Sequence, residues 1–497
     1  MLNALRTGRD ATTVPVGLGL LAGAGSAAAL LATYWDDSWH TDKGRDDFAI
    51  PPHLLLYGGV LVASLAVAAW GLMAWRRAGW GVGGVRSVLG DPALLLAGIG
   101  GATTLASGPV DAAWHEIYGR DAVIWSPPHL TAVLGTLALS VGLLAGLRLA
   151  QGRAGALARL LAAAGVIGTL QVPVLEYDSD VPQFSVLWFL PVAALGVCAA
   201  VALLNDLLPG PREAVGAAVV YTLLRAGTVA FLAAAGFSLT LVPPVVVAFA
   251  LAALLRDKGP VLRLILLGAA VPLVWWPFLR LQADVTTLVP LALLPGSVAL
   301  GALAGLLVAL AHGDLRLSRA AAARTAVVVA ALALAVGAVP GQDAAWAHDP
   351  GQGEQLREGE LTVAREGGTA RITMELPGAC DGLTAGGAVA RRAGQALHGP
   401  LRVEDAPGGC RLDGTVDGLG EGRWFVYAEA RDDDGTALEA WLPAAPGETD
   451  TEVRPLYAPP VAADAGTRNA AGAALLAVCA ALLVACLRLA RRSRAFA

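Results

Sequence analysis

The stretch VPVGLGLLAGAGSAAALLATY, residues 14–34, contains no charged side chain. Because a helix of about 20 apolar residues crosses a hydrocarbon core of ~30 Å, this stretch predicts a transmembrane helix. Similar runs follow at residues 53–75, 91–112, 129–149, 156–175, 185–205, 214–234, 237–255, 260–280, 286–311, 322–340 and 468–487. The sequence therefore predicts a polytopic all-α protein with about 12 transmembrane helices in a lipid bilayer.

The overall composition agrees with this prediction. Of the 497 residues, 56% are hydrophobic and 15% are charged, whereas about a quarter of the residues in a soluble domain are charged. A soluble globular protein is therefore excluded. The net charge is -5 and the basic residues are spread over separate loops, so no nucleic-acid-binding surface is expected.

Basic residues predict the orientation of the chain, because loops rich in Arg and Lys stay in the cytoplasm. They gather at Arg6 and Arg9, Arg76 and Arg77, Arg148 and Arg153, Arg256 and Lys258, Arg316 to Arg324, and Arg491 to Arg494. All of these segments lie on one side if every span crosses. We therefore expect a cell-membrane protein with both termini in the cytoplasm and with the loops 35–52, 111–128 and 176–184 outside.

One large polar segment, residues 341–465, differs from the rest and predicts a small β domain outside the cell. Its alternating stretch 424–430 is followed by Asp432-Asp-Asp-Gly435, a sequence typical of a hairpin turn. We expect an immunoglobulin-like or cupredoxin-like β-sandwich. Cys380 and Cys410 both lie in this segment and could form a disulfide in an oxidising compartment. Residues 466–497 then form the last helix and a basic cytoplasmic tail.

A sequence motif occurs twice, about 75 residues apart. Residues 36–53 read DDSWHTDKGRDDFAIPPH and residues 111–129 read DAAWHEIYGRDAVIWSPPH. Both copies contain Asp-x-x-x-His, then Gly-Arg-Asp, then Pro-Pro-His, and each lies where one span ends outside and the next begins. Residues 1–150 are therefore expected to be a duplicated two-helix unit of four transmembrane helices, and residues 151–340 to contain the further spans.

Each copy of the motif can bring one carboxylate and two imidazoles together. An Asp and a His four residues apart share one helical face, and the Pro-Pro pair can start the next helix just before the second His. The expected metal ligands are Asp36, His40 and His53 in the first copy and Asp111, His115 and His129 in the second. Imidazole and carboxylate suit copper, with zinc and iron as alternatives.

A structural role for the motif is the alternative interpretation. Asp46 with Arg45, and Asp121 with Arg120, could form ion pairs that hold each loop together. Against this, four of the seven histidines in the chain fall at equivalent positions of the two copies. Ionisable groups at membrane depth are costly unless they have a role.

The first copy resembles the copper-ligand segment of a membrane subunit of the particulate methane and ammonia monooxygenases. The resemblance rests on Asp36-x3-His40-x12-His53, with Arg45-Asp46-Asp-Phe before His53 and Tyr57 after it. It implies that Asp36, His40 and His53 bind copper in the membrane and that other membrane subunits are partners. The second copy departs by one residue, having thirteen between its histidines. The resemblance covers about 25 residues per copy.

The third outer loop, with Glu176, Asp178 and Asp180, could supply carboxylates to a neighbouring site, although a solvated acidic turn is the favoured interpretation. Arg225 lies well inside a predicted span. It is expected to face the bundle interior with a partner, or to extend to the membrane edge.

The β segment contributes two further candidate ligands. Ala345-Trp-Ala347-His348 resembles a signal-peptidase site, and cleavage there would make His348 an N-terminal copper chelator, as in the family of small periplasmic copper-binding β-sandwich proteins. His398 would be its second ligand. An uncut domain with a Cys380 to Cys410 disulfide is the favoured interpretation.

The sequence thus predicts a copper-binding membrane protein that resembles a monooxygenase oxidising an apolar substrate. A non-enzymatic protein for copper storage, delivery or sensing is the main alternative. A membrane scaffold or transporter with structural Asp/His motifs is the third.

Overall fold

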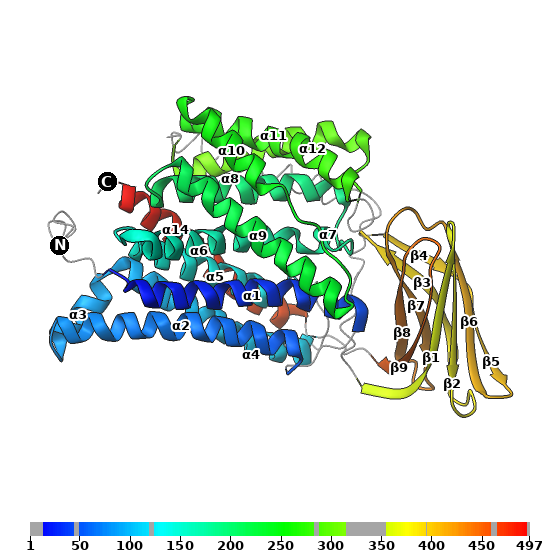
Figure 1. The fold of residues 1–497 in the computed structure, drawn as a ribbon. Coiled ribbons are helices and arrows are strands. Elements are labelled where there is room, and N and C mark those ends of the chain that lie inside the picture. The colour runs from blue at the N-terminus through cyan, green and yellow to red at the C-terminus, as the bar shows by residue number, and fades with distance from the viewer. Residues whose placement is uncertain are drawn as a thin grey trace.

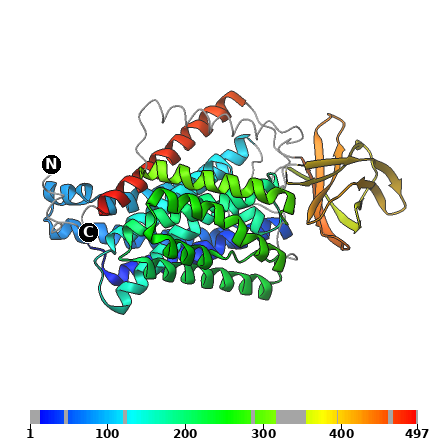
Figure 2. The same ribbon diagram turned by 90° about the horizontal axis from the view of Figure 1, so that it is seen from above.

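The computed structural model describes residues 13–43, 49–118, 124–282, 288–314, 354–393, 395–458 and 465–494. In this part of the chain, a bundle of helices lies beside a separate β domain (Figure 1). The helices run roughly along one direction, and the β domain lies at one end of them. Helix α1 begins, and helix α14 ends, at the opposite end of the bundle (Figure 2).

The described α-helices are α1 Val16–Lys43, α2 Pro51–Arg77, α3 Val82–Gly90, α4 Pro92–Tyr118, α5 Pro127–Gly146, α6 Gly152–Gln171, α7 Leu175–Asp178, α8 Phe189–Leu207, α9 Pro211–Ala235, α10 Val245–Leu254, α11 Pro260–Leu281, α12 Leu294–His312 and α14 Ala465–Arg494. Within the described residues, ten spans are long and apolar enough to cross a membrane. They correspond to ten of the predicted runs and indicate a membrane protein. The predicted run 322–340 lies outside the described residues.

The predicted helix at 237–255 is wrong as a continuous helix. Helix α9 ends at Ala235 and is capped by Gly236, which has a left-handed φ of 74°, and residues 237–244 are not helical before α10 begins at Val245. Pro243 and Pro244 precede α10, and proline removes the backbone donors that a continuous helix needs. Hydropathy alone cannot detect this break because the segment is apolar throughout.

Close contacts between glycines join the helices that carry the two motif copies. A Cβ atom added to Gly25 of α1 would lie 2.5 Å from the carbonyl oxygen of Gly59 in α2. In the second pair, a Cβ on Gly100 of α4 would lie 2.6 Å from the carbonyl oxygen of Gly135 in α5. Small residues allow membrane helices to approach this closely. Each helix pair therefore holds the two sides of one motif together.

The β domain is a nine-stranded antiparallel sheet with the order β4-β3-β7-β8-β9-β1-β2-β6-β5. Its strands are β1 Glu354–Glu366, β2 Thr369–Leu376, β3 Thr384–Arg392, β4 Gln395–Gly399, β5 Leu401–Ala406, β6 Gly409–Asp417, β7 Trp424–Arg431, β8 Ala437–Ala444 and β9 Thr449–Ala458. The predicted hairpin is confirmed, since β7 and β8 pair across a turn in which Gly435 has φ 78°. Cys380 and Cys410 form a disulfide.

The β domain contacts the bundle at the third outer loop. Val181 is buried against Phe425, Tyr427 and Trp441 of the sheet. Beside it, the Arg392 guanidinium forms an ion pair of 2.7 Å with the Asp180 carboxylate.

A second group of contacts joins the β domain to the end of α1. Arg454 of β9 donates hydrogen bonds to the carbonyl oxygens of Asp42, at 2.9 Å, and Lys43. Arg423 donates to the Ser238 hydroxyl at 3.0 Å, and the backbone N–H of Ser238 donates to Asp42. The sheet is therefore attached to the end of the helix that carries Asp36 and His40.

Candidate metal centre

Two adjacent helix ends position the first set of predicted ligands. Asp36 and His40 lie one turn apart in the last part of α1, so their side chains project from the same face. Helix α2 begins at Pro51, after Ile50 in an extended conformation, with proline in its first turn. His53 therefore lies in the first turn of the returning helix, as the Pro-Pro pair predicts.

The structure brings these three side chains together. The Asp36 Oδ1 atom lies 3.4 Å from His40 Nε2 and 3.1 Å from His53 Nε2. One ligand atom from each residue lies within 4.8 Å of the others. The three side chains are 19%, 5% and 12% exposed, in that order, so water competes little for the ligand atoms.

The geometry of this set suits a metal ion. An ion bonded at about 2.0–2.2 Å to nitrogen and oxygen keeps its ligand atoms about 3–4 Å apart. The distances within the Asp36 set fall in or near this range, so small side-chain rotations would suffice for binding. Both imidazoles would release the proton facing Asp36 when they bind metal, so affinity should fall with acid.

The second copy of the motif is arranged similarly where the structure describes it. Asp111 lies in α4 and His129 in the first turn of α5, where the Ser126 hydroxyl caps the helix by accepting from the His129 N–H. The His129 Nε2 atom lies 3.1 Å from Asp111 Oδ2. His115 belongs to α4, but its side chain is outside the described part of the chain.

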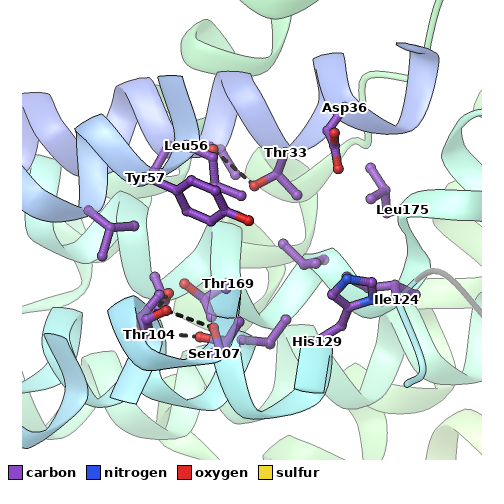
Figure 3. Close-up of a pocket in the computed structure, with 18 of the residues that line it drawn as sticks. Thr33, Asp36, Leu56, Tyr57, Thr104, Ser107, Ile124, His129, Thr169 and Leu175 are labelled. Carbon is purple, nitrogen blue, oxygen red and sulfur yellow. Dashed lines mark hydrogen bonds between the residues drawn. The ribbon is translucent and has the colours of Figure 1, made fainter. Parts of the chain in front are cut away.

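The described ligands of both sets face one cavity of about 140 Å³. Asp36, His40 and His53 line it from α1 and α2, and Asp111 and His129 line it from α4 and α5. Figure 3 shows Asp36 and His129 directed toward the same space from different helices. Much of the remaining wall is apolar, with Leu30, Leu56, Val60, Ile124, Val133 and Leu175 among its residues.

The favoured interpretation of the third outer loop as a solvated acidic turn is wrong. Glu176 is 1% exposed and Asp178 is fully buried, and both contact residues of the bundle. The Glu176 Oε1 atom accepts a hydrogen bond of 3.1 Å from the Ile124 N–H. Glu176 therefore holds the segment that leads into α5. Neither Glu176 nor Asp178 lines the cavity.

Arg225 faces the bundle interior with a partner, which confirms the first of its two expected placements. Its Nη2 atom lies 3.8 Å from Asp178 Oδ2, and both side chains are fully buried. The same nitrogen donates to the Thr240 hydroxyl at 2.9 Å and to the Leu241 carbonyl oxygen. The guanidinium also lies over the Tyr34 ring. Arg225 thus joins α9 to the third outer loop and to the non-helical segment before α10.

The remaining candidates do not join this site. His398 is exposed on β4 and does not line the cavity. Asp46, Asp121 and His348 lie outside the described residues. The pairings of Asp46 with Arg45 and of Asp121 with Arg120 therefore stay predictions.

The sequence interpretation missed the hydroxyl side chains that line the cavity farther from the ligands. Ser107 and Thr104 lie four and seven residues before Asp111 on α4. Helical periodicity places all three on one face. Tracing that face inward from Asp111 would have found them.

The fold and the site together define a class, a multi-pass helical membrane protein with a buried Asp/His cluster and a β domain at one end of the bundle. Comparison with models of known protein families, with curated proteins and with solved structures finds no significant match for this chain.

Proposed function

We propose that this protein binds copper at Asp36, His40 and His53, and a second ion at the corresponding residues Asp111, His115 and His129. The observation that carries the proposal is the convergence of Asp36, His40 and His53 to within 4.8 Å at the wall of a cavity. Three ligand side chains at a buried position fit a metal site better than a stabilising ion pair, which needs one partner.

Copper is favoured over zinc and iron by the resemblance in the first motif copy. Two imidazoles and a carboxylate suit copper, zinc and iron. No cysteine is among the residues that line the cavity, so a thiolate site is not supported. The spacing of Asp36, His40 and His53 is that of the copper-ligand segment in the monooxygenase family.

A monooxygenase-like activity on an apolar substrate is the function we propose for this site. Such a reaction places one atom of dioxygen into a C–H bond, while two electrons and two protons from a reductant convert the other atom into water. The apolar wall beside the ligands supports this proposal, since a lipophilic substrate could enter it from the bilayer. Other membrane subunits would supply the electrons.

We also propose the cell-membrane orientation in which both termini are cytoplasmic and the β domain lies outside. The common end at which α1 begins and α14 ends supports this orientation (Figure 1). The disulfide between Cys380 and Cys410 fits an oxidising compartment. His312, the last residue of α12, contacts Asp206 near the end of α8 at 2.8 Å, so these two helices end on the same side. In the proposed orientation that side is the cytoplasm, and a further span at 322–340 would return the chain to the outer side.

We propose in addition that the nine strands of the β domain are folded as a sandwich.

Metal analysis of the purified protein tests the metal site. We expect about one or two copper ions per chain after copper loading, because there are two ligand sets. Changing His40→Ala or His53→Ala should remove about one ion. The matched control is His398→Ala, which removes an exposed imidazole from β4. A wild-type protein that stays metal-free after loading contradicts the proposal.

Product formation separates an oxygenase from a copper carrier. Membranes containing the copper-loaded protein, supplied with a lipophilic substrate, dioxygen and a reductant, should form a hydroxylated product. His53→Ala should abolish it. Copper binding without any product, in membranes that retain the partner subunits, would favour storage, delivery or sensing instead.

A further inference from the structure

Hydroxyl groups line much of the cavity beside the candidate ligands. They include Thr33, Thr104, Ser107, Thr136, Ser140 and Thr169 on α1, α4, α5 and α6, and Ser26 and Tyr57 line the cavity as well. In Figure 3, Thr104 and Ser107 lie at one end of the cavity, and Asp36 and His129 lie at the other. Buried hydroxyls need hydrogen-bond partners, so it matters where the protons and lone pairs of this group are directed.

The two helices of the second motif copy place hydroxyls at matching depth. Thr104 lies seven residues before Asp111 on α4, and Thr136 lies seven residues after His129 on α5. At 1.5 Å per residue, each hydroxyl lies about 10 Å along its helix from the ligand residue. The two hydroxyl oxygens are 3.3 Å apart. The polar inner end is therefore built by the same helices that carry the second ligand set.

Four of these hydroxyls donate their single proton to a backbone carbonyl. Thr33 donates to Ala29 at 2.9 Å, Ser107 to Thr104 at 2.7 Å, and Thr169 to Gly165 at 2.8 Å. Thr104 similarly reaches the Gly100 carbonyl oxygen at 3.0 Å. A hydroxyl has one proton and two lone pairs. The oxygens therefore offer lone pairs to the cavity, which makes its inner end a hydrogen-bond acceptor.

Ser140 adds a buried hydroxyl that can both donate and accept a hydrogen bond. Its side chain is 1% exposed, and its hydroxyl has no hydrogen-bond partner among the described residues. Buried polar groups are nearly always satisfied by protein, water or a ligand. An unsatisfied hydroxyl at the wall of a cavity indicates that the cavity's occupant supplies the missing partner.

The volume of the cavity limits the size of that occupant. A cavity of about 140 Å³ is close to the ~150 Å³ of an engineered protein cavity that binds benzene. A single ring or a short chain therefore fits. The wall also includes Leu30, Val60 and Val133, which suit an apolar body.

We propose that the cavity binds a small amphiphilic molecule, with an apolar body and one O–H or N–H donor that reaches Thr104, Thr136 and Ser140. This inference rests on the proposed function, because it names the kind of ligand taken by the same site. A plain hydrocarbon would leave the acceptor oxygens without a donor. A site that hydrogen-bonds a ligand hydroxyl discriminates against the analogue that lacks it.

Phenol and toluene test the proposal, because they have the same number of non-hydrogen atoms and differ in a hydroxyl against a methyl group. Binding to the full-length, metal-free protein is measured by equilibrium dialysis in detergent, with protein-free micelles as the blank for partitioning. We expect phenol to bind at least about tenfold more tightly than toluene. The double change Thr104→Val with Thr136→Val should abolish that preference and leave toluene binding unchanged.

Thr131→Val is the matched control. Thr131 lies on α5 as Thr136 does, but its hydroxyl donates to the Pro127 carbonyl oxygen and it does not line the cavity. This variant should retain the phenol preference. If the double variant fails to fold, Ser140→Ala alone should weaken phenol binding several-fold.

Three results would overturn the proposal. Toluene could bind as tightly as phenol, the phenol preference could survive in the Thr104 and Thr136 double variant, or neither ligand could bind above the micelle blank. The last result would mean that the hydroxyls hold water only. Copper content, measured in parallel, keeps the two proposals apart, since a protein that prefers phenol but binds no copper refutes only the metal site.

Discussion

At the scale of single residues, one carboxylate organises the candidate metal centre. The Asp36 oxygen Oδ1 lies within 3.4 Å of two imidazoles that come from different helices. The negative charge of Asp36 favours its contacts with His40 and His53, and its carboxylate oxygen supplies the hard ligand of the set. A neutral amide of the same shape could keep the contacts but would lose the charge.

Asp36→Asn should therefore weaken copper binding by at least about tenfold while leaving the fold intact, because metal affinity depends on an ionised ligand. Isothermal titration with copper in detergent measures the change. Asp413→Asn, which alters a carboxylate of β6, is the control and should bind copper like the wild type. An Asp36→Asn protein with wild-type affinity would show that this carboxylate is not a ligand.

Arg225 and Asp178 form a buried ion pair, and each of the two side chains is needed for the stability of the bundle. Both are fully buried, and their charged groups lie 3.8 Å apart. Removing one partner leaves a buried charge uncompensated, which costs about 3–5 kcal/mol. Arg225→Met should lower the free energy of unfolding by that amount, measured by denaturant titration in detergent.

The control for this change is an exposed pair. Arg256 lies 3.6 Å from Asp257, and these side chains are 66% and 87% exposed. Such a pair contributes about 0–1 kcal/mol, so Arg256→Met should leave unfolding nearly unchanged. Adding Asp178→Leu to Arg225→Met should recover part of the lost stability. If Arg225→Met and Arg256→Met behave alike, the buried pair has no special role.

At the scale of elements, a disulfide between two segments of the β domain contributes to its stability. In the β domain, the disulfide joins the segment after β2 to β6 across 30 residues of sequence. Closing a loop of this length reduces the entropy of the unfolded chain. It thereby stabilises the domain by about 3–4 kcal/mol in the chain-entropy description.

Replacing both cysteines, Cys380→Ser with Cys410→Ser, should therefore destabilise the β domain by about 3–4 kcal/mol. Hydrogen exchange of the β6 amides should become faster, while exchange in α5 should stay as in the wild type. The wild-type protein treated with a reductant is the parallel sample and should behave like the double variant. Unchanged exchange in β6 would mean that strand pairing alone stabilises this region.

At the scale of the whole molecule, the β domain is attached to the same end of the bundle as the candidate metal centre. Arg392 and Asp180 form an ion pair across this interface, with side chains 7% and 15% exposed. Next to it, the Ala393 N–H donates to the Pro182 carbonyl oxygen at 2.7 Å. These contacts cover the third outer loop. In the same loop, Glu176 accepts a hydrogen bond from Ile124, and Ile124 lines the cavity.

Arg392→Ala should therefore loosen the attachment of the β domain. Removing one partner of a largely buried pair costs several kcal/mol, so the amides of residues 176–184 and of Ala393 should exchange faster by about tenfold or more. Arg411→Ala is the control, because Arg411 pairs with Glu375 in the same domain with side chains 44% and 56% exposed. Equal exchange in the two variants would contradict the role of Arg392.

Much of the local architecture followed from the sequence because it depends on neighbouring residues. The apolar runs predicted the ten described spans, since the length of an apolar stretch decides whether it can cross a membrane. The spacing of Asp36 and His40, and the Pro-Pro pair before His53, predicted that these ligands would meet across one loop. The turn at Asp432 to Gly435 likewise predicted the β7 and β8 hairpin.

Only the tertiary structure decided which distant residues lie together. It buried Asp178 against Arg225 across 47 positions of sequence, and it covered Asp180 with Arg392 from another domain. It also brought Asp36, His40 and His53, Asp111 and His129, and the Thr104 and Thr136 hydroxyls to one cavity. These contacts depend on how whole helices and the sheet pack, and packing is set by surfaces made from residues far apart in the chain. The Asp/His motif could be recognised in the sequence because its residues lie within one turn of helix and one loop. The cavity that it faces could not be predicted, because the cavity forms only when the helices of the bundle pack together.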